Sequence, residues 1–395
     1  MSDDYTEVSS ESWLSRIGSS IKGIFFGFAL FGISFVLLGW NEYRSVVTAN
    51  SLGEAQSVVI SVDNKEVSQA NQGKLVHVTG KAVPGDAVAD STFGISTNVL
   101  QLKRIVEMYQ WKEKKEEKEE KELGGSTKKT TTYKYSKEWS GEIQDSAQFK
   151  NTDARQKNRN PNAMPYQSNV VKVQEATVGA FELNQELIGQ INEFQPLAMT
   201  SETLASVPEE TAQNLKVNDG GYYRGSDPGN PAIGDLRIKF EIAPSCDVSI
   251  LAQQTANGFS PWQAKAGDQL QVLYTGILTS AEIIKKQMEA NAMLTWILRF
   301  VGFIMMFIGL NMMVAPFAVL ADVLPFMGNI VGAGTSIVCG LIAFALSLMT
   351  IALVWILVRP IIAIPLLLLG FAAIIGVIFL IVSYSKKKTA PAPAY

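Results

Sequence analysis

The residue types that most often carry out catalytic or metal chemistry are scarce in this chain. His77 is the only histidine, and the two cysteines, Cys246 and Cys339, lie far apart in the sequence. A Ser-His-Asp triad would have to use His77, but its place between Val76 and Val78 in an alternating stretch favours a structural histidine of a β-strand. A zinc site needs three or four histidine, cysteine or carboxylate ligands. We therefore expect no catalytic residues, no metal site and no cofactor.

A second candidate is the segment at residues 219–231, DGGYYRGSDPGNP, which reads as a loop. It collects Tyr222, Tyr223, Arg224 and Asp227, whose side chains together could bind a polar ligand or a partner. The alternative is a structured turn, because Gly, Asp, Asn and Pro are the residues that turns require. The glycine pairs of the chain also lack the strand–loop–helix context of a phosphate-binding loop.

Charged residues beside or inside apolar stretches allow a more specific prediction about contacts between the apolar segments. Glu42, Arg299 and Arg359 all have this placement. A charge at membrane depth is costly unless it is paired or reaches the interface. We hypothesise an intramembrane ion-pair network in which Glu42 binds Arg299 or Arg359 and ties the first apolar helix to the later ones. Snorkelling of the arginines to the interface is the alternative.

Small residues at helical spacing suggest where the apolar segments touch. Gly23 and Gly27 form a GxxxG motif, and Gly328 and Gly332 form another. Such spacing permits close helix approach in lipid, where packing has to supply the attraction. We take Gly23 and Gly27 as candidate helix-packing residues, with chance occurrence in a glycine-rich apolar sequence as the alternative.

The elements that would position these residues are four apolar stretches of membrane-spanning length. Crossing about 30 Å of hydrocarbon takes roughly 20 apolar residues in a helix. The first stretch has no small-residue cleavage site and is interpreted as a retained anchor rather than a signal peptide. The expected segments are an N-terminal tail over 1–20, transmembrane helices at 21–41, 292–316, 330–358 and 360–384, and a basic tail over 385–395.

Basic residues in the flanks predict the orientation of these spans. Arg16 and Lys22 lie before or at the start of the first span, and Lys386, Lys387 and Lys388 follow the last. Because Lys and Arg mark cytoplasmic flanks, both tails are expected in the cytoplasm. The insert over residues 42–291 is then expected on the opposite face, in the periplasm or exterior of a bacterium or the lumen of an internal membrane.

The insert is predicted to be mainly β-structure. Alternating, β-branched stretches such as 57–62 and 74–83 are typical of short strands. The Lys/Glu block over 112–122 is either a solvated helix or one arm of a long hairpin whose turn is at 123–126; alternating Tyr and Trp in both arms favour the hairpin. The predicted fold class is thus an α-helical membrane protein, one plus three spans, with a large β-rich (α+β) domain inserted after the first span.

Several stretches also carry a family resemblance, in a shared order and with similar spacing. They are WNEYRSV (40–46), VEMYQW (106–111), EWSGEI (138–143), NRNPNAM (158–164), VGAFEL (178–183), GDLRIKF (234–240), AKAGDQL (264–270) and TWILRFVGFIMMFIGLNMM (295–313). These resemble the transmembrane protein 43 family, also called LUMA. The chain departs from animal members in lacking Asn-x-Ser/Thr sequons and in its shorter N-terminal tail, which points to a prokaryotic relative.

The resemblance implies a function without a known catalytic residue. It implies an insert like an oligonucleotide/oligosaccharide-binding (OB) barrel, self-association, and an organising role in membrane protein complexes that include emerin and lamins. If the chain is like the animal members, the resemblance implies a location in the endoplasmic reticulum or inner nuclear membrane. If it is a bacterial relative, the resemblance implies the cell (inner) membrane and a response to membrane perturbation.

Together these observations predict a non-enzymatic membrane scaffold or membrane-stress sensor. Its expected partners are membrane lipid, further copies of itself and other membrane proteins. A net charge of −3 gives no electrostatic footprint for nucleic acid. The alternative from another class is a channel or transporter subunit, with Asn311 and Asp322 lining a polar path; a membrane-bound hydrolase comes third.

Overall fold

The computed structural model describes residues 4–323, 325–358, 364–365, 368–372 and 374–379. The protein divides into two units. The β unit comprises Met1–Thr6, Ser51–Glu116 and Thr132–Lys286, and the helical unit comprises Glu7–Asn50, Glu117–Thr131 and Gln287–Tyr395. Residues 42–50, 117–131 and 287–291 of the insert expected over 42–291 are assigned to the helical unit.

An eight-stranded sheet runs in the order β1-β7-β6-β14-β13-β12, with β11 beside β14 and β8 beside β6. Its strands are β1 (Tyr5–Glu11), β6 (Gln101–Lys121), β7 (Thr127–Ser140), β8 (Asn169–Lys172), β11 (Gln195–Leu197), β12 (Leu215–Asn218), β13 (Gly221–Arg224) and β14 (Leu236–Ala243). In β14, Leu236, Ile238 and Phe240 are buried because alternate side chains of a strand face the same side. Strands β14 and β6 pair in antiparallel orientation, with Ile238 opposite Val106.

A seven-stranded sheet runs in the order β10-β9-β3-β15-β16, with β19 beside β15 and β2 beside β3. Its strands are β2 (Ile60–Val62), β3 (Leu75–Pro84), β9 (Ala176–Val178), β10 (Phe181–Glu182), β15 (Cys246–Gln254), β16 (Phe259–Ser260) and β19 (Val272–Thr275). Only the β2–β3 pair among them is parallel in the described chain. Val78 and Ile250 of this sheet share one hydrophobic cluster with Val106 and Phe240 of the other sheet, so the two sheets enclose a common core.

Smaller elements complete the β unit. They are two hairpins, β4 (Val88–Asp90) with β5 (Ile95–Thr97) and β17 (Trp262–Gln263) with β18 (Gln269–Leu270), and the short helices η1 (Gln69–Asn71), η2 (Ser146–Gln148), α2 (Thr152–Lys157), α3 (Gln185–Gly189), α4 (Ser201–Ala205) and α5 (Glu209–Ala212). The β-rich character of the insert is thus confirmed, whereas its likeness to an OB barrel stays a prediction.

The Lys/Glu block forms one arm of a hairpin, not a solvated helix. Residues 112–121 lie in β6, and β7 is its partner strand. Opposite charges face one another across the arms, with Lys112 Nζ 2.5 Å from Glu138 Oε1 and Lys134 Nζ 2.7 Å from Glu116 Oε2. Each exposed pair contributes little by itself. The aromatic alternation supplies a second contact, since the ring centres of Tyr109 and Trp139 are 5.2 Å apart.

Three long helices follow the apolar stretches of the sequence. They are α1 (Trp13–Val58), α6 (Ser280–Ala321) and α7 (Pro325–Val358), and all three contain a segment long and apolar enough to cross a membrane. The residues predicted as a helix at 280–291 run without a break into the second apolar segment, and α6 continues past Pro316. The predicted fourth span, 360–384, lies only in part within the described residues, and a shorter apolar helix is assigned there to Leu368–Phe379.

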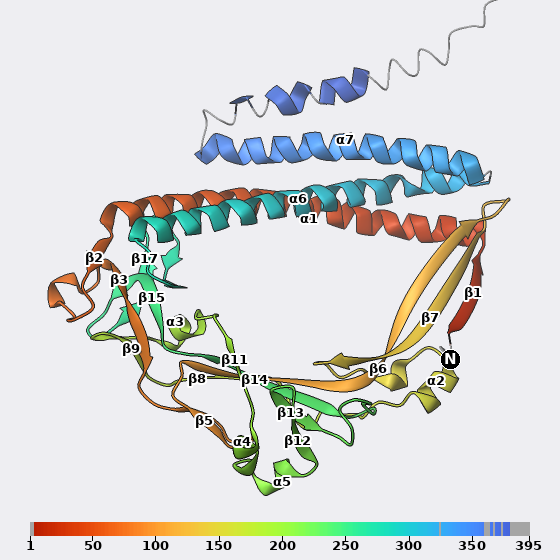
Figure 1. Ribbon diagram of the computed structural model, residues 1–395. Helices are drawn as coiled ribbons and strands as arrows, with labels where there is room; N and C mark the ends of the chain where they lie inside the picture. The colour runs from red at the N-terminus through yellow and green to blue at the C-terminus, as the bar shows by residue number, and fades with distance from the viewer. Residues whose placement is uncertain (1–3, 324, 359–363, 366–367, 373, 380–395) are drawn as a thin grey trace, which may run out of the picture. The chain divides into compact units, whose positions relative to one another are not determined.

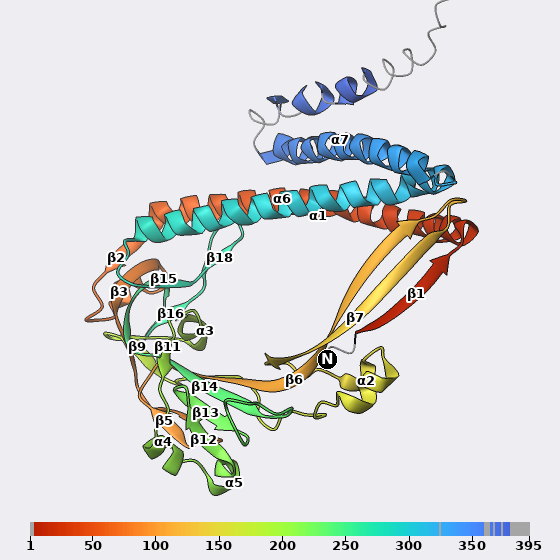
Figure 2. The same ribbon diagram turned by 45° about the vertical axis from the view of Figure 1, so that its right-hand side comes forward.

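Within the helical unit, α6 lies alongside α1, and α7 lies alongside α6, as both views show (Figure 1, Figure 2). The backbones of α1 and α6 approach each other closely at Gly27 and Gly309. A Cβ added to Gly27 would lie 2.8 Å from the Gly309 carbonyl oxygen, and one added to Gly309 would lie 2.8 Å from that of Gly27. Gly23 is less tightly placed, with the Met312 Cε atom at 3.7 Å. Gly27 therefore makes the tighter contact with α6, and the role of Gly23 in helix packing stays a prediction.

We predict that Gly27→Leu destabilises the full-length protein in detergent, because the side chain has to displace the α6 backbone. Overpacking of a close contact costs about 1–3 kcal/mol, and thermal unfolding followed by circular dichroism measures it. Gly32→Leu is the matched control, since nothing lies within 4 Å of a Cβ at that position. Equal loss of stability in the two variants would contradict the assignment of Gly27.

Candidate functional site: a buried ion pair between the helices

Glu42 and Arg299 form a two-pronged ion pair between α1 and α6. Arg299 Nε lies 2.6 Å from Glu42 Oε1, and Arg299 Nη2 lies 2.8 Å from Glu42 Oε2. The Glu42 side chain is only 1% exposed and that of Arg299 is 16% exposed. Bidentate contact of this kind is the strongest geometry that a guanidinium and a carboxylate can adopt. The structure thus brings together two of the three residues of the hypothesised network.

The third member is a tryptophan from α7. Trp355 Nε1 donates a hydrogen bond of 2.5 Å to Glu42 Oε2. The Arg299 guanidinium carbon lies 4.7 Å from the centre of the Trp296 ring and 5.4 Å from that of Trp355, so the cation also contacts aromatic faces. One carboxylate consequently connects α1, α6 and α7. Arg359, the other expected partner, lies outside the described residues.

A layer of polar side chains, with Arg44 among them, adjoins the ion pair on α1 and α6. The Asn41 side-chain amide donates to the Thr295 carbonyl oxygen at 3.0 Å, and the Asn291 amide donates to that of Ser45, also at 3.0 Å. Arg44 donates to the side-chain oxygens of Asn291 and Thr295 at 3.0 and 3.2 Å. These residues follow directly on the apolar part of α1, so polar side chains appear where the helices begin to need hydrogen-bonded partners.

The geometry of this cluster suits a structural role, holding the helices together, better than a catalytic one. Removing one partner of a buried ion pair leaves an uncompensated charge and costs about 3–5 kcal/mol. Lipid provides neither water nor counter-ions to replace the missing partner. Through its contacts with Arg299 and Trp355, the Glu42 carboxylate therefore links the positions of all three helices.

Three of the residues predicted to lie in a ligand-binding loop, Tyr222, Tyr223 and Arg224, lie instead in strand β13, and only Asp227 lies in the loop that follows. Tyr222 and Tyr223 are buried, and their hydroxyls donate to Thr203 Oγ1 at 2.8 Å and to Asp235 Oδ2 at 2.5 Å. Burial, with the Asp235 contact, raises the pKa of Tyr223. Both tyrosines border a hollow of about 130 Å³ that does not include Arg224 or Asp227. The four residues thus do not converge on one pocket.

The remaining two loop residues also have contacts within the fold. The Arg224 guanidinium stacks 5.5 Å from the Tyr166 ring centre, and Asp227 Oδ1 accepts a hydrogen bond from the Gly229 amide at 2.9 Å. Their role in ligand binding stays a prediction. Only the Asp227 contact lies within the turn, whereas Arg224 packs against a residue outside the segment.

His77 has both ring nitrogens engaged. Nδ1 lies 3.2 Å from Ser61 Oγ, and Nε2 lies 2.9 Å from the Leu278 carbonyl oxygen. Burial lowers the pKa of His77, which favours the neutral ring. The contacts join β3 to β2 and to the segment before α6. Among the described residues, no group of three or more His, Cys, Asp or Glu side chains could hold a metal ion.

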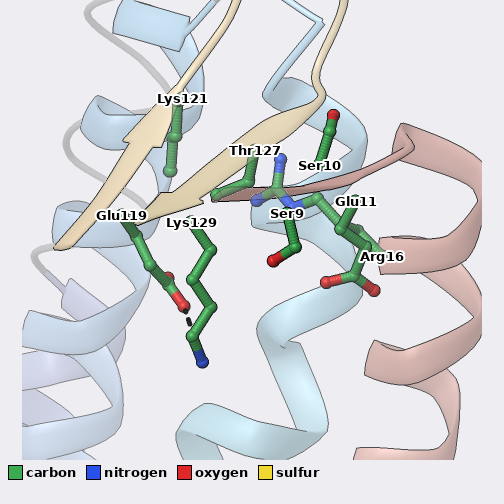
Figure 3. Close-up of a pocket in the computed structure, with 8 residues that line it drawn as sticks. All are labelled: Ser9, Ser10, Glu11, Arg16, Glu119, Lys121, Thr127 and Lys129. Carbon is green, nitrogen blue, oxygen red and sulfur yellow. Dashed lines mark ion pairs between the residues drawn. The ribbon is translucent and has the colours of Figure 1, made fainter. Parts of the chain in front are cut away.

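A second buried carboxylate lies at the other end of the same helices. The Asp322 side chain is 1% exposed and pairs with Arg16 and with Lys121, whose Nζ is 2.8 Å from Asp322 Oδ1. Beside this cluster is a polar cavity of about 400 Å³. Figure 3 shows the eight side chains that line it: Ser9, Ser10, Glu11, Arg16, Glu119, Lys121, Thr127 and Lys129. Sequence reasoning considered Asp322 only as part of a polar path in the channel alternative, and it missed these partners.

Long apolar helices joined by buried charges, together with a β-rich insert, define this chain as a multi-helix membrane protein with a large extramembrane part. The family model of transmembrane protein 43 matches residues 108–360. The chain is 32% identical to transmembrane protein 43 of Rattus norvegicus, over 95% of this chain and 94% of the rat protein. The protein belongs to the transmembrane protein 43 family.

Other relatives give the same result. The human transmembrane protein 43 is 32% identical, over 93% of this chain and 91% of the human protein. The transmembrane protein 43 homolog of Drosophila melanogaster is 31% identical, over 87% of this chain and 92% of the fly protein. No solved structure gives a significant match.

We predict that Glu42→Arg destabilises the protein by about 3–5 kcal/mol, because it places two guanidinium groups against one another in a buried site. Adding Arg299→Glu restores an ion pair with the charges exchanged and should recover part of the loss. The measurement is thermal unfolding of the full-length protein in detergent.

The control is Glu202→Arg, a charge reversal on the exposed surface of α4, which should change stability little. A double variant no more stable than Glu42→Arg alone would contradict a direct interaction between the two side chains.

Proposed function

We propose that this protein is a non-enzymatic membrane scaffold, whose helices associate with lipid, with further copies of the chain and with other membrane proteins. The observation that carries the proposal is the Glu42–Arg299–Trp355 cluster, which fixes three apolar helices relative to one another. A scaffold requires such a fixed surface. The same cluster would let the protein respond to membrane stress, because a change in helix packing has to strain a buried ion pair.

Large apolar side chains on the outside of the helices support contact with lipid and membrane partners. Phe25 and Phe28 of α1 are 76% and 60% exposed, and Phe300 of α6 is 63% exposed. Apolar surface of this extent is typical of membrane or protein interaction sites. We place the protein in a cellular membrane, either the inner membrane of a bacterium or the endoplasmic reticulum or inner nuclear membrane of a eukaryote.

A channel or transporter subunit is the less favoured reading, because the polar groups expected to line a path are used within the chain. Asn311 Oδ1 accepts a hydrogen bond of 2.7 Å from Ser336 Oγ, and its amide donates to the Phe307 carbonyl oxygen at 2.8 Å. Asp322 is buried against two cations. Side chains engaged in this way do not offer a hydrated route for an ion.

Site-specific photocrosslinking in intact membranes tests the scaffold proposal. A photoreactive residue in place of exposed Phe28 is expected to capture a second copy or another membrane protein. The same residue in place of Leu38, which is fully buried, should capture only segments of its own chain. Absence of intermolecular products at Phe28, or unitary currents or turnover of lipid or glycan by the reconstituted protein, would overturn the proposal.

A further inference from the structure

Arg299 has hydrogen-bond donors that its ion pair with Glu42 does not use. Its Nε and Nη2 atoms donate to the two carboxylate oxygens at 2.6 and 2.8 Å. A guanidinium carries N–H groups on all three of its nitrogens, so those of Nη1 remain. Nη1 has no hydrogen-bond partner among the described residues and is not buried by them. Because an unmet donor in apolar surroundings is costly, these N–H groups require a further acceptor.

Exposed aromatic side chains lie close to this guanidinium and its partner. The ring centre of Trp296 on α6 is 4.7 Å from the Arg299 guanidinium carbon, and this tryptophan is 68% exposed. Trp40 and Tyr43 of α1, which lie next to Glu42 in the sequence, are 54% and 61% exposed. Tryptophan and tyrosine are enriched at the level of the lipid headgroups. The ion pair is therefore flanked by side chains typical of that level.

The apolar runs of α1 and α6 also end at the ion pair. Residues 21–40 of α1 come before it and residues 300–321 of α6 come after it, with a single charged residue between the two runs. At about 1.5 Å per residue, the runs extend about 30 and 33 Å, close to the roughly 30 Å of bilayer hydrocarbon. Because Gly27 contacts Gly309, both runs extend from the ion pair in the same direction. These lengths match a bilayer whose hydrocarbon begins at the level of the ion pair.

The polar cluster at this level carries more positive than negative charge. Arg44 donates to the neutral side-chain oxygens of Asn291 and Thr295 at 3.0 and 3.2 Å. No carboxylate pairs with Arg44 in the part of the chain that the structure describes. The Glu42 carboxylate is thus bonded to one guanidinium, that of Arg299, while a second guanidinium close by has no counter-ion. An anionic ligand would neutralise this excess of positive charge.

We propose that a membrane phospholipid binds here through its phosphate group, with Arg299 Nη1 donating to a phosphate oxygen beside the exposed Trp296 ring. Hydrogen bonds between a guanidinium and a phosphate are charge-assisted, so the phosphate is a stronger acceptor than a lipid ester carbonyl or water. The inference rests on the membrane location in the proposed function and adds to it a specific lipid contact. Through this contact, the arginine that joins α1 to α6 also bonds to the surrounding lipid.

Solid-state nuclear magnetic resonance of the full-length protein in phospholipid bilayers tests the proposal. The protein carries isotope-labelled arginine, glutamate and tryptophan, and dipolar coupling to phosphorus identifies each guanidinium carbon that lies beside a lipid phosphate. The Arg299 guanidinium carbon is expected to lose signal when this coupling is switched on. Arg299→Lys keeps a cation opposite Glu42 but removes the guanidinium, so the phosphorus-coupled signal should disappear while circular dichroism shows that the protein is folded.

The matched control is Arg237→Lys. Arg237 pairs with Glu107 at 2.5 Å and lies 4.8 Å from the Trp139 ring centre, so it has the same kinds of contact on strand β14 instead of an apolar helix. This variant should keep the phosphorus-coupled signal. If Arg299→Lys does not fold, the control still identifies the signal, because the guanidinium that retains both glutamate and indole contacts is then that of Arg299.

Absence of phosphorus coupling at Arg299 would overturn the proposal, as would loss of the coupled signal in Arg237→Lys instead of Arg299→Lys. A second sample contains the protein in bilayers of a phosphate-free glycolipid, supplied with inorganic phosphate. Equal coupling in that sample would also overturn the proposal, because the ligand would then be a free anion. Photocrosslinking at Phe28 tests the scaffold separately, so intermolecular crosslinks without phosphorus coupling would reject the lipid contact alone.

Discussion

A buried carboxylate between apolar helices is the constraint on which the helical unit depends. An unpaired carboxylate in hydrocarbon is costly, and so is an unpaired guanidinium. Their bidentate contact offsets both costs, and the Trp355 donor brings α7 into the same arrangement. Because each partner needs the other two, none of the three helices can slide or turn without exposing a charge.

Close packing extends this constraint along the helices. Gly27 and Gly309 bring the backbones of α1 and α6 together some turns away from Glu42. Leu38, Met306 and Ala343 form a buried cluster between these two regions of α1, α6 and α7. At the far end, Asp322 and its two cations join the helix termini to the hairpin tip. Charge pairing therefore fixes the ends of the helical unit, and packing fixes its middle.

The sequence predicted contacts correctly where leaving a residue without its partner would cost much free energy. The need of Arg299 for a partner pointed to Glu42, and alternating aromatic residues pointed to the β6–β7 hairpin, because both signals are local or follow from hydropathy. Trp355 was missed because a tryptophan near the end of an apolar segment is typical of the membrane interface. Tyr222 and Tyr223 look available in the sequence, yet each buries its ring and keeps only its hydroxyl bonded.

Pairings between distant segments could not be predicted in the same way. Lys121 is one of many Lys and Glu residues in its block, and nothing in its local pattern selects Asp322 as its partner. Gly125 likewise reads as an ordinary turn glycine until Trp13 occupies the space beside it. Such contacts form only once the whole chain is folded, so no short stretch of sequence predicts them.

A double-mutant cycle between Glu42 and Trp355 tests the central claim most directly. The free energies of unfolding of the intact protein, Glu42→Ala, Trp355→Phe and the double variant are compared in the same detergent. If the carboxylate joins α1 to α7, Trp355→Phe costs stability in the native background and little once Glu42 is gone, with a coupling of about 1 kcal/mol or more. Additivity within about 0.3–0.5 kcal/mol would contradict the claim.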